Sequence, residues 1–157
     1  MRSQVVNTKE YPDVSFYLGE VYLTLTHMEV QSLASYYEIL LEDLEAFRAA
    51  IESSSNFDSA IANQFAKIEQ LYREKILVLA AENGDRGSSE NETDSSYLWR
   101  SLQTETHKML RLLQTDLIFL QSSRQEATKQ QRKANCLAKI ERLMGYCQQI
   151  LTELRKG

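Results

Sequence analysis

The scarcity of helix-breaking residues constrains this chain more than any other feature. Its 157 residues include only 5 Gly and 1 Pro. Because these two residue types interrupt helices most strongly, the composition favours long helices over many short strands and turns. The length suits one domain, and hydrophobic residues make up 43% of the chain, which is enough for a packed core.

Four segments repeat apolar residues at spacings of three and four, which is the period of an amphipathic α-helix. We predict helices at about residues 28–53, 57–83, 97–123 and 126–155. The expected core positions are Val30, Leu33, Tyr37, Leu40, Leu41, Leu44, Phe47, Ile51, Ile61, Phe65, Ile68, Tyr72 and Leu79, with Ile76 beside them, then Leu98, Leu102, Met109, Leu113, Leu117, Leu120, Leu137, Ile140, Met144, Cys147, Leu151 and Leu154.

The connections between these segments are short and polar. Residues 84–96 are a stretch of Gly, Ser, Asn, Asp and Glu with few apolar residues, which we interpret as a flexible connection. We therefore predict an all-α fold in which residues 28–157 form an antiparallel four-helix bundle of two helical hairpins. The alternative is a longer coiled-coil hairpin that completes its core as a homodimer, because the last helix carries a heptad-like seam.

Residues 1–27 form an N-terminal extension of uncertain structure. The run Val14–Thr26 is rich in β-branched and aromatic residues, which favours a strand. A single strand without a partner is not stable, so the segment is expected to pack as a short helix or to stay loosely attached. Met28 begins the clear helical pattern, and a hypothesis is that translation can also start there.

Charge and hydropathy exclude two classes of partner. The net charge of −4 argues against a general nucleic-acid binder. No run approaches the roughly 18 apolar residues of a membrane span, and the first residues lack a secretory pattern, so we expect a cytoplasmic protein. Cys136 and Cys147 are eleven residues apart on one predicted helix, which is roughly 16 Å, so we expect two reduced core thiols.

No catalytic signature is present in the sequence. His27 and His107 are far apart, and neither has Cys, Asp or Glu at the spacing of metal ligands. The glycine-rich phosphate loop, the nucleophile elbow and the di-iron pattern of helical bundles are all missing. We therefore expect a non-enzymatic protein without metal or cofactor.

Charge is separated along the chain. Residues 28–56 hold six acidic residues and one basic residue, whereas residues 124–157 hold eight basic residues and three acidic ones. One interpretation is that the first and fourth helices lie side by side and complement each other. The other is that one of these charged faces docks an oppositely charged partner.

Two carboxylates interrupt the apolar face of the third helix. On a helical wheel, Glu105 and Asp116 fall in the middle of that face. A buried carboxylate needs a partner or must be neutral. One interpretation is an internal pair with a base such as Arg73 or Lys139, and the other is a partly open face that awaits a partner.

The opposite side of the third helix is the candidate partner-binding surface. Basic residues beside aromatic and aliphatic ones suit a protein contact, although a simply solvated face remains the alternative. We expect the basic fourth helix to contribute further contacts to the same partner. Leu110 lies with Trp99 at the edge of this surface. The candidate partner-binding residues are Trp99, Arg100, His107, Arg111, Ile118, Arg124 and Arg142.

The run Leu102–Arg124, LQTETHKMLRLLQTDLIFLQSSR, resembles the signature of the cyanobacterial heterocyst frequency control proteins, the PatD family. The later run Leu143–Leu151, LMGYCQQIL, is similar to that family's C-terminal helix, and the resemblance covers about residues 30–155. It implies a small helical regulator that sets how often cells of a filament differentiate, with a link to cell division through the tubulin-like protein FtsZ. The polar positions that match the motif are Glu105, His107, Lys108, Arg111, Asp116 and Arg124.

Three functional hypotheses follow. The preferred one is a regulator that binds a protein, with FtsZ as the partner that the resemblance implies. The second is a self-associating coiled-coil scaffold. The third is a bundle that binds a small ligand in a cavity lined by Glu105 and Asp116.

Overall fold

A computed structural model describes residues 13–18, 21–79 and 94–155, with side chains for all of these except residues 13–27, 30 and 94–100. The described chain contains four long helical segments, which confirms the all-α bundle predicted from the sequence. They are α2 (His27–Ser53), α3 (Ser59–Leu71) with its π-helical continuation η1 (Tyr72–Ile76), α5 (Asp94–Ser122) and α6 (Glu126–Arg155). The connection expected at residues 84–96 lies largely outside the described residues.

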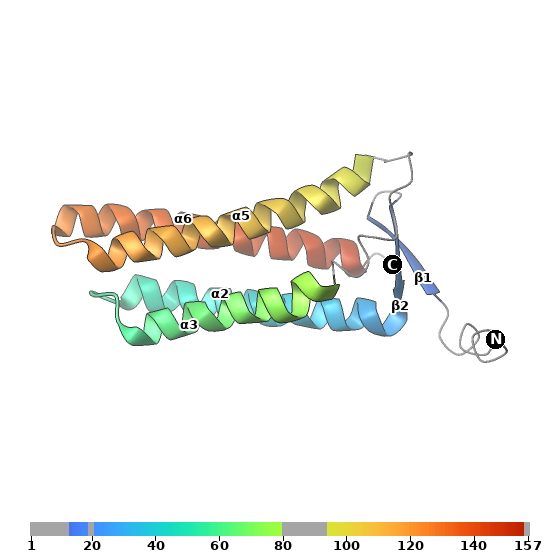
Figure 1. Cartoon of the computed structure of the whole chain (residues 1–157), viewed down its shortest axis with the longest axis horizontal. Helices are drawn as coiled ribbons and strands as arrows, with labels where there is room; N and C mark the ends of the chain where they lie inside the picture. The colour runs from blue at the N-terminus through green and yellow to red at the C-terminus, as the bar shows by residue number, and fades with distance from the viewer. Residues whose placement is uncertain (1–12, 19–20, 80–93, 156–157) are drawn as a thin grey trace.

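The four helices form two antiparallel hairpins that pack against each other. Figure 1 shows α2 and α3 as one pair, with α5 and α6 as the other pair beside it. Helix α6 packs against both α2 and α5, and α2 packs against α3. The acidic first helix and the basic fourth helix are therefore neighbours, as one interpretation of the charge pattern requires.

The β-rich N-terminal run forms a hairpin. Strand β1 (Asp13–Leu18) pairs antiparallel with β2 (Val21–Thr26), and Asp13 lies opposite Thr26 in the register. The hairpin lies across the end of the bundle where α2 begins (Figure 1). From the sequence we expected a single strand without a partner here, and that expectation was wrong. The run divides after Leu18, so the segment supplies its own partner strand.

The core is built from apolar residues of all four helices. Each fully buried Leu, Ile or Phe side chain stabilises the fold by roughly 1.5–3 kcal/mol relative to an exposed one. Cys136 and Cys147 are free and buried in this core, in agreement with the prediction of two core thiols. None of the described helices is long and apolar enough to cross a membrane.

A π-helical turn changes which residues the second helix buries. A regular helix would place Leu79 in the core stripe, with Ile76 beside it, as predicted from the sequence. In the structure Ile76 is only 1% exposed, whereas Leu79 is partly buried. The π-turn accommodates one extra residue, so the residues that follow Tyr72 are rotated relative to a regular helix.

The buried face of α5 is also rotated relative to the prediction. Leu110 was expected at the edge of the partner-binding surface, but it is 5% exposed and belongs to the core. Thr106 is fully buried, and its hydroxyl donates to the carbonyl oxygen of Leu102 at 2.6 Å. The centre of the face is therefore near Leu113, which moves Glu105 from the predicted middle of the face to its margin, where it is partly exposed.

The apolar seam predicted for α6 is buried against other helices of the same chain. Ile140, Cys147 and Leu154 are at most 3% exposed and pack in the same core as residues of α2 and α5. Because these positions are already covered, the alternative in which α6 completes its core by dimerising loses its main sequence argument.

Candidate protein-binding face

Eight exposed side chains form a continuous band along the outer side of α5. The band spans sixteen residues, which is roughly 24 Å of helix. We call it the α5 face, and its members are Thr104, His107, Lys108, Arg111, Leu112, Thr115, Ile118 and Phe119.

Six of the eight residues of the α5 face line an open groove. The groove has a volume of about 700 Å³, and Leu77 lines it from the second helical segment. Tyr72 of η1 contacts α5 on the other side of the groove in two ways. Its ring lies 6.4 Å from the His107 ring, and its hydroxyl donates to the Gln103 carbonyl oxygen at 3.5 Å. The π-turn therefore helps to set the position of Leu77 relative to α5. The lining residues are Leu77, Gln103, Thr104, His107, Lys108, Arg111, Leu112 and Thr115.

Positive charge on the α5 face is largely uncompensated. Lys108 approaches Glu105 at 3.8 Å, but both side chains are well exposed, so this pair contributes little stability. Within the described part of the chain, Arg111 and His107 form no ion pair with a carboxylate. The guanidinium group of Arg111 is therefore free to meet an acidic partner.

Large apolar side chains lie beside these cations. Leu112, Phe119 and Ile118 are 41%, 45% and 58% exposed. The guanidinium group of Arg132 on α6 lies 4.7 Å from the centre of the Phe119 ring, which holds one side of that ring in place. Exposed apolar groups rimmed by charge are typical of protein-interaction surfaces.

The structure brings together only part of the predicted surface. His107, Arg111 and Ile118 all belong to the α5 face. Arg124 is exposed beyond the end of α5, and Arg142 is exposed on α6, so neither lines the groove.

Two further predicted positions, Trp99 and Arg100, lie on α5, but their side chains are outside the described set.

Of the three large apolar side chains of the α5 face, the sequence predicted Ile118 but not Leu112 or Phe119. Leu112 and Phe119 are seven residues apart, a spacing that places two side chains on the same side of a helix. Neither residue belongs to the apolar stripe predicted to face the core. Their position outside that stripe is the sequence feature that could have indicated their exposure. Leu77 could not have been found in this way, because its place depends on the π-turn.

The two unexplained carboxylates of α5 have different surroundings. Asp116 forms an ion pair and hydrogen bond with Lys139 of α6, one of the two bases considered from the sequence, and the two side chains are 13% and 23% exposed. Glu105 is 39% exposed, and among the described residues its one ion pair is the weak contact with Lys108. Neither carboxylate lines any of the three pockets and grooves described for this structure.

The opposite charges of α2 and α6 meet at the end of the bundle where the chain ends. Arg155 pairs with Glu38 at 2.6 Å, but both side chains are at least half exposed. Such a pair contributes less than about 1 kcal/mol. A groove between the same helices is lined by Glu38, Glu42 and Glu45 together with Arg155.

Within the described residues, no group of three or more His, Cys, Asp or Glu side chains is arranged to hold a metal ion. Comparisons with known proteins add no relative: no protein-family model matches the chain, no curated protein is detectably similar in sequence, and no solved structure is detectably similar in fold.

Proposed function

We propose that this protein is a helical regulator that acts by binding another protein through the α5 face. The observation that carries the proposal is the exposure of Leu112, Ile118 and Phe119 beside Arg111, which has no ion-pair partner among the described residues. Buried aromatic and aliphatic groups supply most of the energy of protein interfaces, and arginine is enriched among their strongest contacts.

The partner that we propose is FtsZ, and the process is control of heterocyst frequency. This choice rests on the resemblance of Leu102–Arg124 to the PatD signature. The same run contains every residue of the α5 face, so the resemblance and the exposed surface concern one segment of the chain. The mechanism is stoichiometric: occupancy of a surface on FtsZ would shift its assembly, with no chemical step.

Sedimentation of purified FtsZ with the full chain tests both parts of the proposal. The wild-type protein is expected to change the fraction of FtsZ in the pellet. The variants Arg111→Ala and Leu112→Ser are each expected to weaken binding by roughly tenfold or more, because interface anchors typically contribute above about 1.4 kcal/mol.

Two matched variants control for general effects of charge and polarity. Arg142→Ala removes an arginine of α6 that is also exposed, and Ile39→Ser removes an apolar side chain of α2 that is 44% exposed. Both are expected to bind FtsZ like the wild type. An unchanged FtsZ pellet at saturating protein would contradict the choice of FtsZ, and equal losses in all four variants would contradict the α5 face.

Salt dependence tests the electrostatic part of the surface. Raising ionic strength is expected to weaken binding by the wild type and to have less effect on Arg111→Ala, because exposed charges are screened within about 10 Å at 0.1 M salt. Circular dichroism under the same conditions should show unchanged helix content. A loss of helicity in parallel with binding would contradict this assignment.

Light scattering separates this function from self-association. The same apolar side chains could pair with a second copy of the chain, which is the scaffold alternative. A monomer at binding concentrations is expected. A dimer that Leu112→Ser dissociates would reassign the α5 face to self-association.

A further inference from the structure

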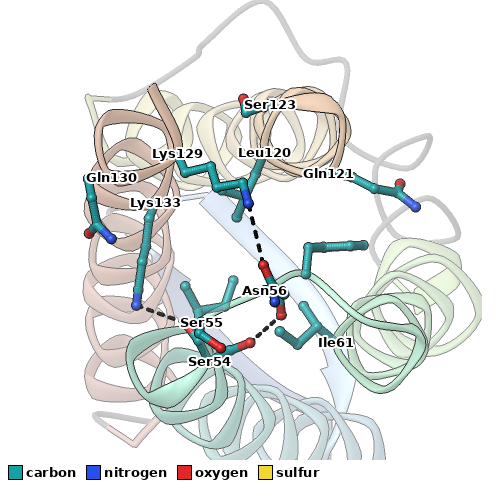
Figure 2. A pocket seen from close by; sticks show the side chains of 12 residues that line it. Ser54, Ser55, Asn56, Ile61, Leu120, Gln121, Ser123, Lys129, Gln130 and Lys133 are labelled. Atoms are coloured by element: carbon teal, nitrogen blue, oxygen red, sulfur yellow. Dashed lines mark hydrogen bonds between the residues drawn. The ribbon is translucent and has the colours of Figure 1, made fainter. Parts of the chain in front are cut away.

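The loops at one end of the bundle enclose a small polar pocket. The α2–α3 loop and the α5–α6 connection meet there, and α6 lies across both (Figure 2). The pocket has a volume of about 110 Å³, enough for several water molecules and hence for a small ion. We call it the loop-end pocket, and it is lined by Ile51, Ser54, Ser55, Asn56, Phe57, Ile61, Leu120, Gln121, Ser123, Lys129, Gln130 and Lys133.

Two partly buried lysines of α6 point into the loop that walls the loop-end pocket. Figure 2 shows their ammonium groups directed at the residues between α2 and α3. Lys129 Nζ donates to Asn56 Oδ1 at 3.4 Å. Lys133 Nζ donates to the carbonyl oxygens of Glu52 and Ser54 at 3.0 and 3.1 Å. Every one of these acceptors is electrically neutral.

The positive charge of this pair is not balanced by the described side chains. Glu52, Asp58 and Glu126 are the nearest acids in sequence on the adjoining elements, and all three are exposed. None forms an ion pair with either lysine. The carboxylate of Asp58 caps α3 through the Ile61 amide, and that of Glu126 accepts from Gln130.

The C-terminus of α2 offsets only part of the charge. Its carbonyl end carries about half a negative elementary charge, whereas the two ammonium groups carry two positive ones. Like charges one helical turn apart also repel each other, so Lys129 and Lys133 are unfavourable neighbours without an anion. An anion between them would remove this repulsion.

The remaining lining suits an oxyanion. The Ser55 hydroxyl makes no hydrogen bond to another described residue, whereas the hydroxyl groups of Ser54 and Ser123 already donate to the carbonyls of Asn56 and Phe119. Each lysine also has at least one N–H left over from the bonds above. Apolar side chains of Ile51, Ile61 and Leu120 form part of the wall, and their low polarity strengthens electrostatic attraction beside them.

We propose that the loop-end pocket binds a phosphate-type oxyanion, either inorganic phosphate or the phosphate group of a monoester. A phosphate monoester carries a charge of about −1.5 to −2 at pH 7, close to the two positive charges that face it. Its oxygens accept several hydrogen bonds at once, which matches the spare donors of Lys129, Lys133 and Ser55. Binding would tie α6 to the α2–α3 loop and stiffen this end of the bundle.

Titration of the full chain followed by two-dimensional NMR tests this site. Inorganic phosphate, glycerol 3-phosphate and sodium chloride at matched ionic strength serve as three separate probes. Phosphate is expected to shift the backbone amide signals of Ser54–Phe57 selectively and to saturate. Saturation by glycerol 3-phosphate as well would identify the site as one for monoesters, and its absence would identify a site for the free ion. Equal shifts with chloride would overturn the proposal.

Three variants assign the binding to the lysines. Lys129→Gln is expected to weaken phosphate binding at least tenfold, and Lys133→Gln likewise, provided its circular dichroism spectrum is native. Lys67→Gln removes the same charge from an exposed position of α3 and should bind as the wild type does. Wild-type affinity in Lys129→Gln would overturn the proposal. The Leu112→Ser variant should keep its phosphate affinity, so failure here and failure of the α5 face are distinguishable.

Discussion

At the residue scale, the hydroxyl group of Tyr37 is the least compensated polar group of the described core. The residue is fully buried, and its oxygen has no hydrogen-bond partner. Burial raises the pKa of Tyr37 well above its usual value, and the neighbouring Tyr72 and Cys147 raise it further. A buried hydroxyl without a partner costs roughly 1–3 kcal/mol, so this atom should reduce stability.

The substitution Tyr37→Phe is therefore expected to raise the free energy of unfolding by about 1 kcal/mol. It removes the unpaired oxygen and keeps the ring that fills the core. Urea unfolding followed by circular dichroism measures the change, with Tyr36→Phe as the control at the adjacent, partly exposed position. A loss of stability in Tyr37→Phe would show that the hydroxyl has a partner in solution.

The Asp116–Lys139 pair is the ion pair among the described residues that is best protected from solvent. Removing one partner leaves the other partly buried and unpaired, so Asp116→Ala and Lys139→Ala should each cost about 1–3 kcal/mol. A double-mutant cycle is expected to show coupling of about 1 kcal/mol between them. Glu105→Ala, which disturbs only an exposed pair, should stay within about 0.5 kcal/mol of the wild type. Additive effects in the cycle would rule out a functioning pair.

Burial of the two thiols makes stability depend on alkaline pH. Burial raises the pKa of Cys136 and of Cys147 from 9.0 to about 12. Because the folded state holds these protons more tightly than the unfolded state, the stabilisation is complete below pH 9 and is lost as pH rises toward 12.

The midpoint of thermal unfolding should therefore be flat up to about pH 9 and then fall. At pH 8 both thiols should resist a thiol-specific reagent in the native protein and react at once in denaturant, since the thiolate is the reactive form. Rapid modification of native protein at pH 8 would show that a cysteine is accessible and would contradict the burial.

At the element scale, the π-turn of η1 makes the largest difference between sequence and structure. It brings Ile76 into the core and leaves Leu77 beside the groove. Apolar spacing predicted the helix itself and most of its buried side. Apolar spacing could not predict the extra residue of the π-turn, because the sequence of Tyr72–Ile76 is almost as compatible with a regular α-helical turn. The same dependence on exact rotation explains why Leu110 was assigned to the wrong side of α5.

Deletion of a single residue tests this reading of η1. Deleting exposed Arg73 should convert the π-turn into a regular turn and leave the residues after it in register, with a loss of no more than about 2 kcal/mol. Deleting exposed Lys67 from regular α3 should rotate the following core residues by about 100° and cost considerably more. The midpoints of thermal unfolding of the two deletion variants are compared with that of the wild type. Equal destabilisation would mean that η1 does not absorb the deletion.

At the scale of the whole molecule, the bundle follows from features that are local in sequence. Periodicity predicted α2 and α6 to within a residue, and one of the two interpretations of the charge pattern has these helices as neighbours, as they are. The pairing of β1 with β2 was missed because the β-rich run Val14–Thr26 was interpreted as one continuous strand. The groove and the loop-end pocket could not be predicted, since each joins segments that are distant in the chain.

The central claim is that a protein partner binds the α5 face, and site-specific crosslinking to purified FtsZ tests it most directly. A photoreactive benzoylphenylalanine replaces Leu112 in one protein and Ile39 in the other, since both positions are exposed and apolar. The account predicts a covalent FtsZ adduct from position 112 and none from position 39. An adduct from position 39 alone, or no adduct from position 112, would contradict it.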